Sequence, residues 1–312
     1  MAADLTHGPG PRPAPGTEAR PASSGDDARA LEAGLDALET AIVAPRRSAA
    51  SAAWSAFWPT ALALVAFLAV WQGLYLAGIK PSYALPSPAD VWATFVDIVR
   101  DGTALKASAL SLQRGGIGFL VSVVVGALLG MAMATIPLLR RALGPIVTGL
   151  QSLPSIAWVP AAIIWFQLSN TTIFAVVLLG AVPSIVNGLL TGVDQVPPLF
   201  LRVGRVLGAQ GWDRIRFVLL PAALPGFLGG LKQGWAFAWR SLMAAELITN
   251  TPRLGTGLGQ VLNLGREVSD MSLVVASILL IFAVGIAIEL LVFSPLERRV
   301  LHARGLTGLA GQ

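Results

Sequence analysis

Three charged side chains lie inside one long apolar stretch of the sequence, and they are the residues best placed to act on another molecule. Lys232, Arg240 and Glu246 stand between about Leu224 and Ile248, where most neighbours are apolar or small. A charge in such surroundings is costly and usually faces a cavity or a partner. These side chains can bind ions electrostatically, because a guanidinium group can hold an anion and a carboxylate can hold a cation.

Helical geometry separates two of these charges. At about 100° per residue, Glu246 shares a stripe with four other side chains, and Arg240 lies roughly 100° from the centre of that stripe. Each therefore needs a facing helix, a second copy of the chain or a bound molecule. A structural ion pair stays open for both, and for Arg240 contact with an anionic substrate is the second interpretation. The four other members of the stripe are Lys232, Trp235, Trp239 and Met243.

Other kinds of chemistry lack the residues they need. The sequence has no Cys, and its two His, His7 and His302, stand in the tails, so thiolate and His-based metal sites are not expected. The glycines of GTGLG at 255–259 follow no strand and are expected in a turn. Because the phosphate-binding pattern G-x-x-x-x-G-K-[ST] does not occur, we expect no ATPase site, no cofactor and no enzyme activity.

Composition indicates an all-α protein that crosses a membrane several times. Of the 312 residues, 54% are hydrophobic and 12% are charged, against about 25% charged in soluble domains. The net charge of +5 comes from Arg side chains spread beside apolar runs, which is not the single basic patch typical of nucleic-acid binding. We expect no nucleic-acid partner, and we expect the protein to contact membrane lipid.

Six membrane spans are predicted, since a span needs roughly 20 apolar residues. The uncharged run from Ala142 to Val193 is too long for one span, and the polar break at 167–172 is expected to divide it into two. The other four spans are expected at about 57–79, 115–139, 224–248 and 271–293.

The distribution of Arg predicts the orientation. The pairs Arg46–Arg47, Arg140–Arg141 and Arg298–Arg299, together with the four Arg between the fourth and fifth spans, all fall on one side if the number of spans is even. Positive charge collects on the cytoplasmic side of membrane proteins. Both termini are therefore expected in the cytoplasm, with Lys232 extending toward that surface.

The sequence divides into three parts. Residues 1–55 are expected to form a cytoplasmic tail, disordered at first and then a short amphipathic helix over 26–43 that packs near the membrane or a neighbouring subunit. Residues 56–300 form the membrane domain, and 301–312 a second cytoplasmic tail. Outside the membrane, 89–100 is expected to be an amphipathic helix whose apolar side carries Val91, Phe95, Ile98 and Val99.

Proline and polar side chains mark two of the predicted spans. Pro154 and Pro160 interrupt the third span, and Gln151, Ser152 and Ser155 can satisfy the backbone groups that a proline frees. The fourth span has the same combination in Pro183, Ser184 and Asn187. One interpretation is a kink that serves packing alone, and the other is a bend that lines a pathway. The candidate pathway residues are Ser152, Pro154, Ser155, Asn187, Trp239, Arg240 and Glu246.

A long basic connection, 199–221, separates the fourth and fifth spans. Leu199, Phe200, Val203 and Leu207 fall on one helical face, and the glycines that follow permit a sharp turn. The segment is longer than the usual connection of about two to eight residues between helices. It is expected to be ordered and to contact a partner outside the membrane, although a surface helix without a partner is the alternative.

The segment resembles the coupling loop of bacterial ABC importer permeases, whose pattern is Glu-Ala-Ala, three residues, Gly, nine residues, Ile-x-Leu-Pro. Gly208 stands on the motif glycine, Val218 on the isoleucine and Pro221 on the proline, whereas Arg202, Val203 and Gly204 replace Glu-Ala-Ala. The resemblance implies that an ATPase subunit contacts this loop. Its candidate coupling residues are Arg202, Val203, Leu207, Gly208, Ala209, Gly211, Asp213, Val218 and Pro221.

A narrower resemblance covers about 58–300. The runs LPSPADVW, SLQRGGIGF, LQSLPSIAWVPAAIIWF, LGAQGWDRIRFVLLPAALPG and AWRSLMAAELI are similar to permeases for nitrate, alkanesulfonates and taurine. This implies a type I importer fold, a permease homodimer, two cytoplasmic ATPase subunits, an external solute-binding protein and a small anionic solute carried across the bacterial cytoplasmic membrane. The alternatives are a secondary transporter, which would need inverted repeats and intramembrane carboxylates, and a membrane scaffold.

Overall fold

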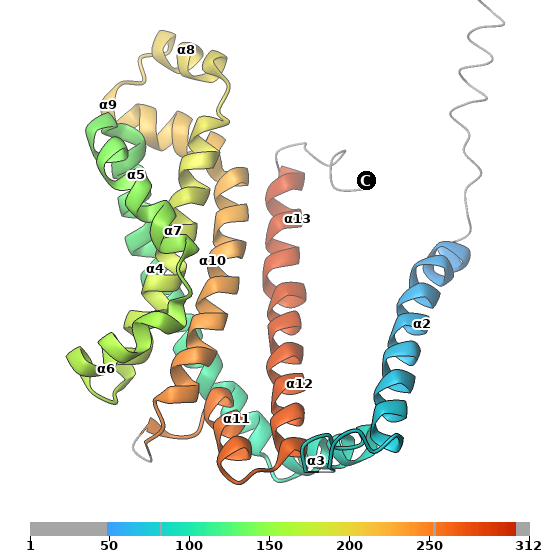
Figure 1. Ribbon diagram of the computed structural model, residues 1–312. Coiled ribbons are helices and arrows are strands. Elements are labelled where there is room, and N and C mark those ends of the chain that lie inside the picture. The colour runs from blue at the N-terminus through green and yellow to red at the C-terminus, as the bar shows by residue number, and fades with distance from the viewer. Residues whose placement is uncertain (1–48, 82, 252–253, 304–312) are drawn as a thin grey trace, which may run out of the picture. The chain divides into compact units, whose positions relative to one another are not determined.

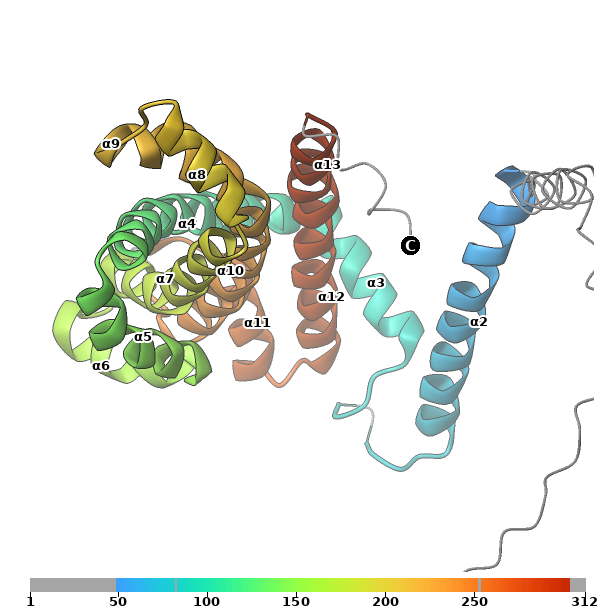
Figure 2. The same cartoon turned by 90° about the horizontal axis from the view of Figure 1, so that it is seen from above.

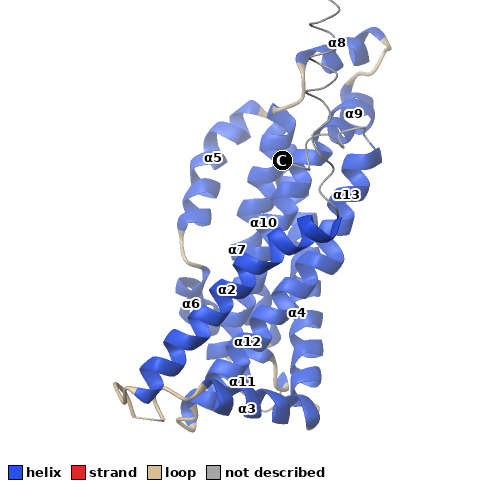
Figure 3. Cartoon of the chain, turned by 90° about the vertical axis from the view of Figure 1, so that its right-hand side faces the viewer, coloured by secondary structure: helices blue, strands red, loops and turns tan. Residues whose placement is uncertain are grey.

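Every regular element that the structure describes is a helix (Figure 3). The computed structural model describes residues 49–81, 83–251 and 254–303. The expected tail helix at 26–43 and most of the tail after 300 lie outside these ranges. The chain divides into two compact units, 1–67 and 68–312, and the helix Ala49–Leu76 crosses the division. That helix begins within the residues expected to form the N-terminal tail.

The described helices follow one another with short connections (Figure 1). In chain order they are α2 (Ala49–Leu76), α3 (Pro88–Arg100), α4 (Thr103–Thr135), α5 (Pro137–Ser152), η1 (Ser155–Trp158), α6 (Val159–Phe166), α7 (Asn170–Asp194), α8 (Pro198–Val206), α9 (Gly211–Asp213), η2 (Arg214–Leu219), α10 (Leu220–Ile248), α11 (Leu258–Glu267), α12 (Met271–Ile288), η4 (Glu289–Phe293) and α13 (Ser294–Ala303).

Five helical stretches in the described part of the chain are long and apolar enough to cross a membrane, and a bent pair can make a sixth span. The bent pair is α5 with η1 and α6, which turn by 100° at the break. The all-α fold is confirmed, and six spans fit if the bent pair counts as one. The expected division at 167–172 is also correct, because α6 ends at Phe166 and α7 begins at Asn170.

Proline decides where two helices end. The second span was expected to continue to Leu139, but α4 ends at Thr135 because Ile136 precedes Pro137 and has extended dihedrals, φ −113° and ψ 101°. A residue before proline avoids the helical region. Pro154 breaks the third span in the same way, with Leu153 at ψ 133°. Pro160 does not, since it lies in the first turn of α6, where proline is tolerated.

Small residues let α7 and α10 approach closely, and Figure 2 shows these helices side by side next to α4. A Cβ added to Gly188 would collide with the Cα of Gly230, and one on Gly226 with the Cα of Gly192. Such contacts between small residues are how membrane helices pack without a hydrophobic driving force. The residues that repeat at every fourth position are Gly180, Ser184, Gly188 and Gly192 on α7 and Gly226, Gly230, Gly234 and Ala238 on α10.

A second small-residue face joins α4 to the other side of α7. Side chains of α7 fill the space above the glycines of α4: Val177 lies over Gly118, Ile185 over Gly126 and Leu189 over Gly130. All three of these apolar side chains are buried. The helix α7 therefore lies between α4 and α10 and forms the centre of the second unit.

The amphipathic helix predicted over 89–100 is present as α3, and most of its predicted apolar face is buried. Ser87 caps α3, and its hydroxyl accepts from the Asp90 N–H at 3.1 Å. Val91 and Ile98 are buried and Phe95 packs against them. Val99 was expected on the same face but is 49% exposed, because one residue along a helix turns the side chain by about 100° away from Ile98.

We predict that Gly230→Ala destabilises the protein and Gly229→Ala does not. A Cβ on Gly230 would meet the Cα of Gly188 at 2.5 Å, whereas one on the adjacent Gly229 would meet nothing within 4 Å. Overpacking typically costs about 1–3 kcal/mol, and an alanine on an exposed helical surface gains up to about 1 kcal/mol. Thermal unfolding in detergent compares the two variants, and equal midpoints would contradict close packing at Gly230.

Candidate functional site

A group of polar side chains meets where the broken third span faces α7. The Asn187 amide donates to Gln151 Oε1 at 2.5 Å, and the Gln151 amide donates to Ser184 Oγ at 3.2 Å. Sequence analysis placed these three residues on two separate proline-containing spans, and the structure brings them together. The result is a chain of amide and hydroxyl groups that can donate to or accept from a polar solute.

The same break reaches α10 through a pair of serines. Ser241 Oγ donates to Ser155 Oγ at 2.7 Å, and Ser155 lies directly after Pro154. Ser152 differs, because its hydroxyl donates to the carbonyl of Gly149 on its own helix. The polar group at the break therefore consists of Gln151, Ser155, Ser184, Asn187 and Ser241, and it uses two of the predicted pathway residues, Ser155 and Asn187.

Trp239 and Arg240 lie in a different place, on the side of α10 that faces α12. They line a cleft of about 710 Å³ between these helices. Trp239 stacks on Trp235 with ring centroids 5.9 Å apart. The Arg240 guanidinium lies over the ring of Phe237, 4.5 Å from its centroid, and its Nε donates to the carbonyl of Ala236 at 3.1 Å. In the described part of the chain it has no carboxylate within ion-pair distance.

Lys232 lies in the same cleft and has carboxylate partners. Its Nζ is 2.5 Å from Glu289 Oε1 and 3.6 Å from Glu297 Oε2. Lys232 was expected to extend toward the membrane surface, and the structure adds that it pairs with Glu289. The pairing was not visible in the sequence, because the two residues lie on different spans with no register to relate them.

Glu246 is the most buried charge among the described residues and it pairs with Arg114. Arg114 Nη1 lies 2.9 Å from Glu246 Oε1, with the two side chains 4% and 0% exposed. The second carboxylate oxygen accepts from Ser111 Oγ at 2.7 Å and from the Gly259 N–H at 3.1 Å. Arg114 also donates to the Leu254 carbonyl. The structural ion pair is thus the interpretation that the geometry of Glu246 favours over a place on the pathway.

The glycines of the GTGLG turn are needed beside this pair. A Cβ on Gly257 would collide with the Glu246 carboxylate, and one on Gly259 would lie 2.6 Å from Glu246 Cβ. The turn therefore packs its bare backbone against the buried acid, in addition to reversing the chain. Sequence analysis did not assign Arg114 to this cluster. The available signal was a lone Arg within the run SLQRGGIGF, next to glycines that allow close packing.

We predict that Glu246→Ala strongly destabilises the protein, because it leaves the Arg114 guanidinium buried without a counterion. Breaking a buried pair in this way costs about 3–5 kcal/mol. The control is Glu289→Ala, which removes a partly exposed partner and should cost about 0–1 kcal/mol. Thermal unfolding in detergent measures both. Adding Arg114→Ala to Glu246→Ala should restore part of the stability, and equal losses for the two single variants would refute the assignment.

The connection between α7 and α10 is ordered by a helix-ending motif at Gly208. Gly208 has φ +85°, which favours glycine. Its N–H donates to the Arg205 carbonyl at 3.1 Å, and the Ala209 N–H donates to the Gly204 carbonyl at 2.9 Å. These two bonds and the left-handed glycine define a Schellman motif. Gly211, with φ +52°, makes the second turn, so both glycines lie where the sequence predicted sharp turns.

Beyond these turns the chain folds back on α8. Gly204 packs directly on Val218, because a Cβ at 204 would lie 2.7 Å from Val218 Cγ2. Val218 belongs to η2, a π-helical turn, and such turns are frequent at functional sites. Pro221 then lies in the first turn of α10, and Asp213 ends α9. The predicted coupling residues thus form one folded unit, with Arg202, Val203, Leu207 and Asp213 exposed.

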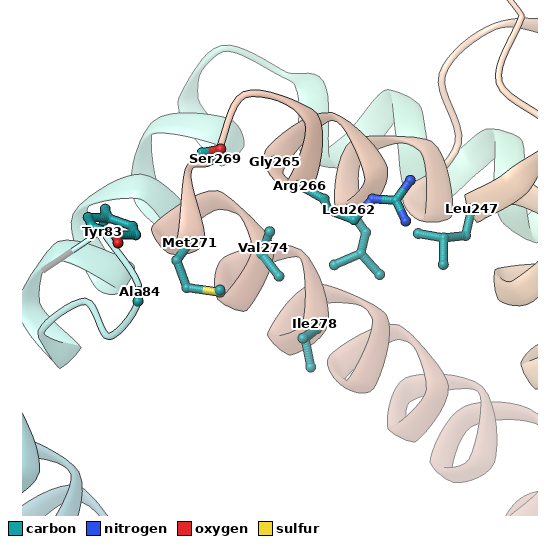
Figure 4. Close-up of a pocket in the computed structure, with 10 residues that line it drawn as sticks. All are labelled: Tyr83, Ala84, Leu247, Leu262, Gly265, Arg266, Ser269, Met271, Val274 and Ile278. Carbon is teal, nitrogen blue, oxygen red and sulfur yellow. The ribbon is translucent and has the colours of Figure 1, made fainter. Parts of the chain in front are cut away.

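A second hollow lies at the end of the second unit that carries α11. Its volume is about 470 Å³. Figure 4 shows Leu247, Leu262, Val274 and Ile278 along it and the Arg266 guanidinium above them. The hollow is apolar apart from a few polar groups. None of the residues that line this hollow belongs to the polar group at Pro154.

These features define a polytopic membrane protein with a polar group among its helices and an ordered loop between α7 and α10. The family described as "Binding-protein-dependent transport system inner membrane component" matches residues 122–302, and the chain belongs to this family. The predicted ABC importer permease is confirmed. The chain is a membrane transport subunit that works with ATPase subunits and a solute-binding protein, and the secondary-transporter alternative is set aside.

Individual relatives agree with this family. The chain is 28% identical over 269 residues to the nitrate import permease protein NrtB of Synechococcus elongatus, covering 81% of this chain and 95% of the relative. It is 30% identical over 232 residues to the taurine transport system permease protein TauC of Escherichia coli, covering 73% and 83%. An inward-facing MetNI methionine ABC transporter structure is 21% identical, with a TM-score of 0.46 over 63% of this chain and 93% of that chain.

Proposed function

We propose that two copies of this chain form the pathway of an ATP-driven importer for a small anion of the nitrate, sulfonate or taurine kind. The observation that carries the proposal is which cations inside the spans have a carboxylate partner. Arg114 pairs with Glu246 and Lys232 pairs with Glu289, whereas Arg240 has no carboxylate partner among the described residues. Its charge is thus available to an anion.

The position of Arg240 also supports a dimer. Its side chain is exposed on the single protomer, and a guanidinium stays charged at physiological pH. A charge inside the membrane faces a partner or a water-filled cavity rather than lipid. A second copy placed against this face of α10 would enclose the guanidinium in a shared aqueous pathway. The names of the relatives, which specify nitrate and taurine, support an anionic solute.

The pathway set is then best described in two parts. The polar group of Gln151, Ser155, Ser184, Asn187 and Ser241 supplies uncharged hydrogen-bonding groups at the break in the third span. Trp239 and Arg240 supply an aromatic wall and a positive charge on another side of α10. Pro154 creates the break, Ser152 stands beside it, and Glu246 holds the nearby helices together through Arg114.

Residues 199–221 are proposed to transmit ATP-driven movement to the spans. The Schellman motif at Gly208 and the contact of Gly204 with Val218 make the loop one unit, and η2 continues into α10 without a gap. A displacement of α8 by a partner is therefore passed directly to the helix that carries Arg240. The membrane domain is proposed to cover 56–300, with tails at 1–55 and 301–312.

We predict that Gly208→Glu abolishes uptake while the protein still inserts in the membrane. A non-glycine residue in the left-handed region costs roughly 1–2 kcal/mol, and the Schellman turn would distort. Gly208→Asn is the matched control, because Asn tolerates this conformation. Solute uptake and ATPase stimulation in proteoliposomes measure both variants. Normal uptake by Gly208→Glu, with normal ATPase association, would refute the coupling role.

We predict that both termini lie in the cytoplasm of a bacterium, on the side of the loop 199–221. The Arg distribution supports this orientation. A cysteine replacing Ser169 should react with an impermeant thiol reagent in intact cells, and one replacing Asp213 only after permeabilisation. The absence of native Cys leaves no background. Reversed labelling of the two sites would overturn the orientation.

We predict that Arg240→Gln lowers uptake at least about 10-fold, which corresponds to roughly 1.4 kcal/mol, without loss of assembly. Stimulation of the ATPase by the solute-binding protein should persist, since the coupling loop is untouched. Arg240→Lys, which keeps the charge, should retain part of the uptake. If Arg240→Gln fails to assemble, the guanidinium serves an ion pair across the dimer, and unchanged uptake would exclude both roles.

A further inference from the structure

The loop between α7 and α10 presents an apolar groove, and four exposed arginines lie in the same loop. We call the groove and these arginines together the coupling surface. The groove lies between α8 and η2 and has a volume of about 540 Å³. Leu207 and Phe217, which lie on opposite sides of the groove, are 80% and 65% exposed. The coupling surface consists of Leu199, Phe200, Val203, Leu207 and Phe217 together with Arg202, Arg205, Arg214 and Arg216.

All four arginines are exposed, and within the described residues none lies within ion-pair distance of a carboxylate. The guanidinium carbon of Arg216 lies over the ring of Phe217, 5.4 Å from its centroid. The only acid between 199 and 221 is Asp213. The surface therefore carries an uncompensated positive charge. Arg140, by comparison, is paired with Asp194 at 2.5 Å.

We propose that the ATPase subunit docks on the coupling surface through an acidic face that carries a projecting apolar side chain. This inference rests on the proposed coupling role and adds the charge of the partner. The importer pattern has a glutamate at the position of Arg202, which calls for a basic group on the partner. Here the sign is reversed, so a matching partner needs carboxylates opposite Arg202 and Arg205. An ATPase with the usual basic group would face like charge, which interfaces avoid.

Anionic lipid is the competing ligand for arginines near a membrane surface. The geometry favours a protein. A helix that lies on lipid presents one continuous apolar face to the bilayer, whereas here two segments enclose a concave groove. Gly204 and Val218 fix these segments against each other, so the groove is preformed. A concave, preformed apolar site in an arginine-rich loop fits a protein side chain and its surrounding surface.

The test measures the affinity of the cognate ATPase subunit for the permease in nanodiscs of phosphatidylcholine. The subunit is identified by co-purification with the tagged wild-type permease and then produced separately. Charge pairing predicts that affinity falls at least about 10-fold between about 50 and about 500 mM NaCl, where the screening length shortens from over 10 Å to under 5 Å. The double variant R202E/R205E should bind about 100-fold more weakly at low salt, because it places like charges opposite each other.

The matched control is R298E/R299E, two exposed arginines of α13 outside the coupling surface, which should bind within about 3-fold of wild type. Replacing carboxylates with lysine on the docking face of the ATPase should restore binding to R202E/R205E. Equal salt dependence and affinity for wild type and R202E/R205E would overturn the acidic partner. Binding by R202E/R205E that is normal in phosphatidylcholine and weakened only with phosphatidylglycerol present would assign the arginines to lipid.

The coupling role itself is tested by Gly208→Glu in the same assay. If that variant binds the ATPase as wild type does and also transports normally, the proposed coupling loop is wrong. If it loses binding or transport while R202E/R205E binds normally, the coupling loop stands and only the inferred charge of the partner is wrong.

Discussion

The close contact between α7 and α10 is the packing on which the other helices of the second unit depend. In a bilayer the lipid tails are as apolar as leucine, so helices associate through close van der Waals contact rather than through removal of water. Glycine at 188, 192, 226 and 230 brings two backbones within contact, and α4 then packs its own small residues against the far side of α7. Ser184 and Ser241, which lie on these faces, are thereby held next to the break at Pro154.

Much of this architecture follows from the sequence because its signals are local. Uncharged runs locate the spans, the polar break at 167–172 divides two of them, and positive φ is required where Gly208 and Gly211 stand in a loop. Even the proline effect is local, although of the two prolines in the third span only Pro154 breaks the helix. Pro160 does not, and the distinction depends on which proline falls in a first turn, a boundary that the sequence does not mark.

The pairing of side chains between distant helices could not be predicted in the same way. Arg114 and Glu246 are far apart in the chain, and the wheel of a single helix says only that Glu246 needs a partner, without naming it. Helix rotation and relative depth decide the pairing, and both depend on the small-residue faces. The same holds for Lys232 and Glu289, and for the separation of Trp239 and Arg240 from the polar group that contains Asn187.

The break at Pro154 has a consequence for the medium in which a solute travels. Among the last carbonyls of α5, that of Gly149 accepts from the Ser152 hydroxyl and that of Leu150 from the Leu153 N–H. The carbonyls of Gln151 and Ser152 have no following helical turn to bond, and Pro154 contributes no N–H. Lipid cannot satisfy such peptide groups, so within a membrane they favour contact with water or a polar solute. We therefore infer that the interior beside the break is hydrated before a solute arrives. A polar solute there exchanges hydrogen bonds with water for hydrogen bonds with the protein. The free-energy barrier to its passage is then the cost of displacing water, not the larger cost of entering an apolar medium.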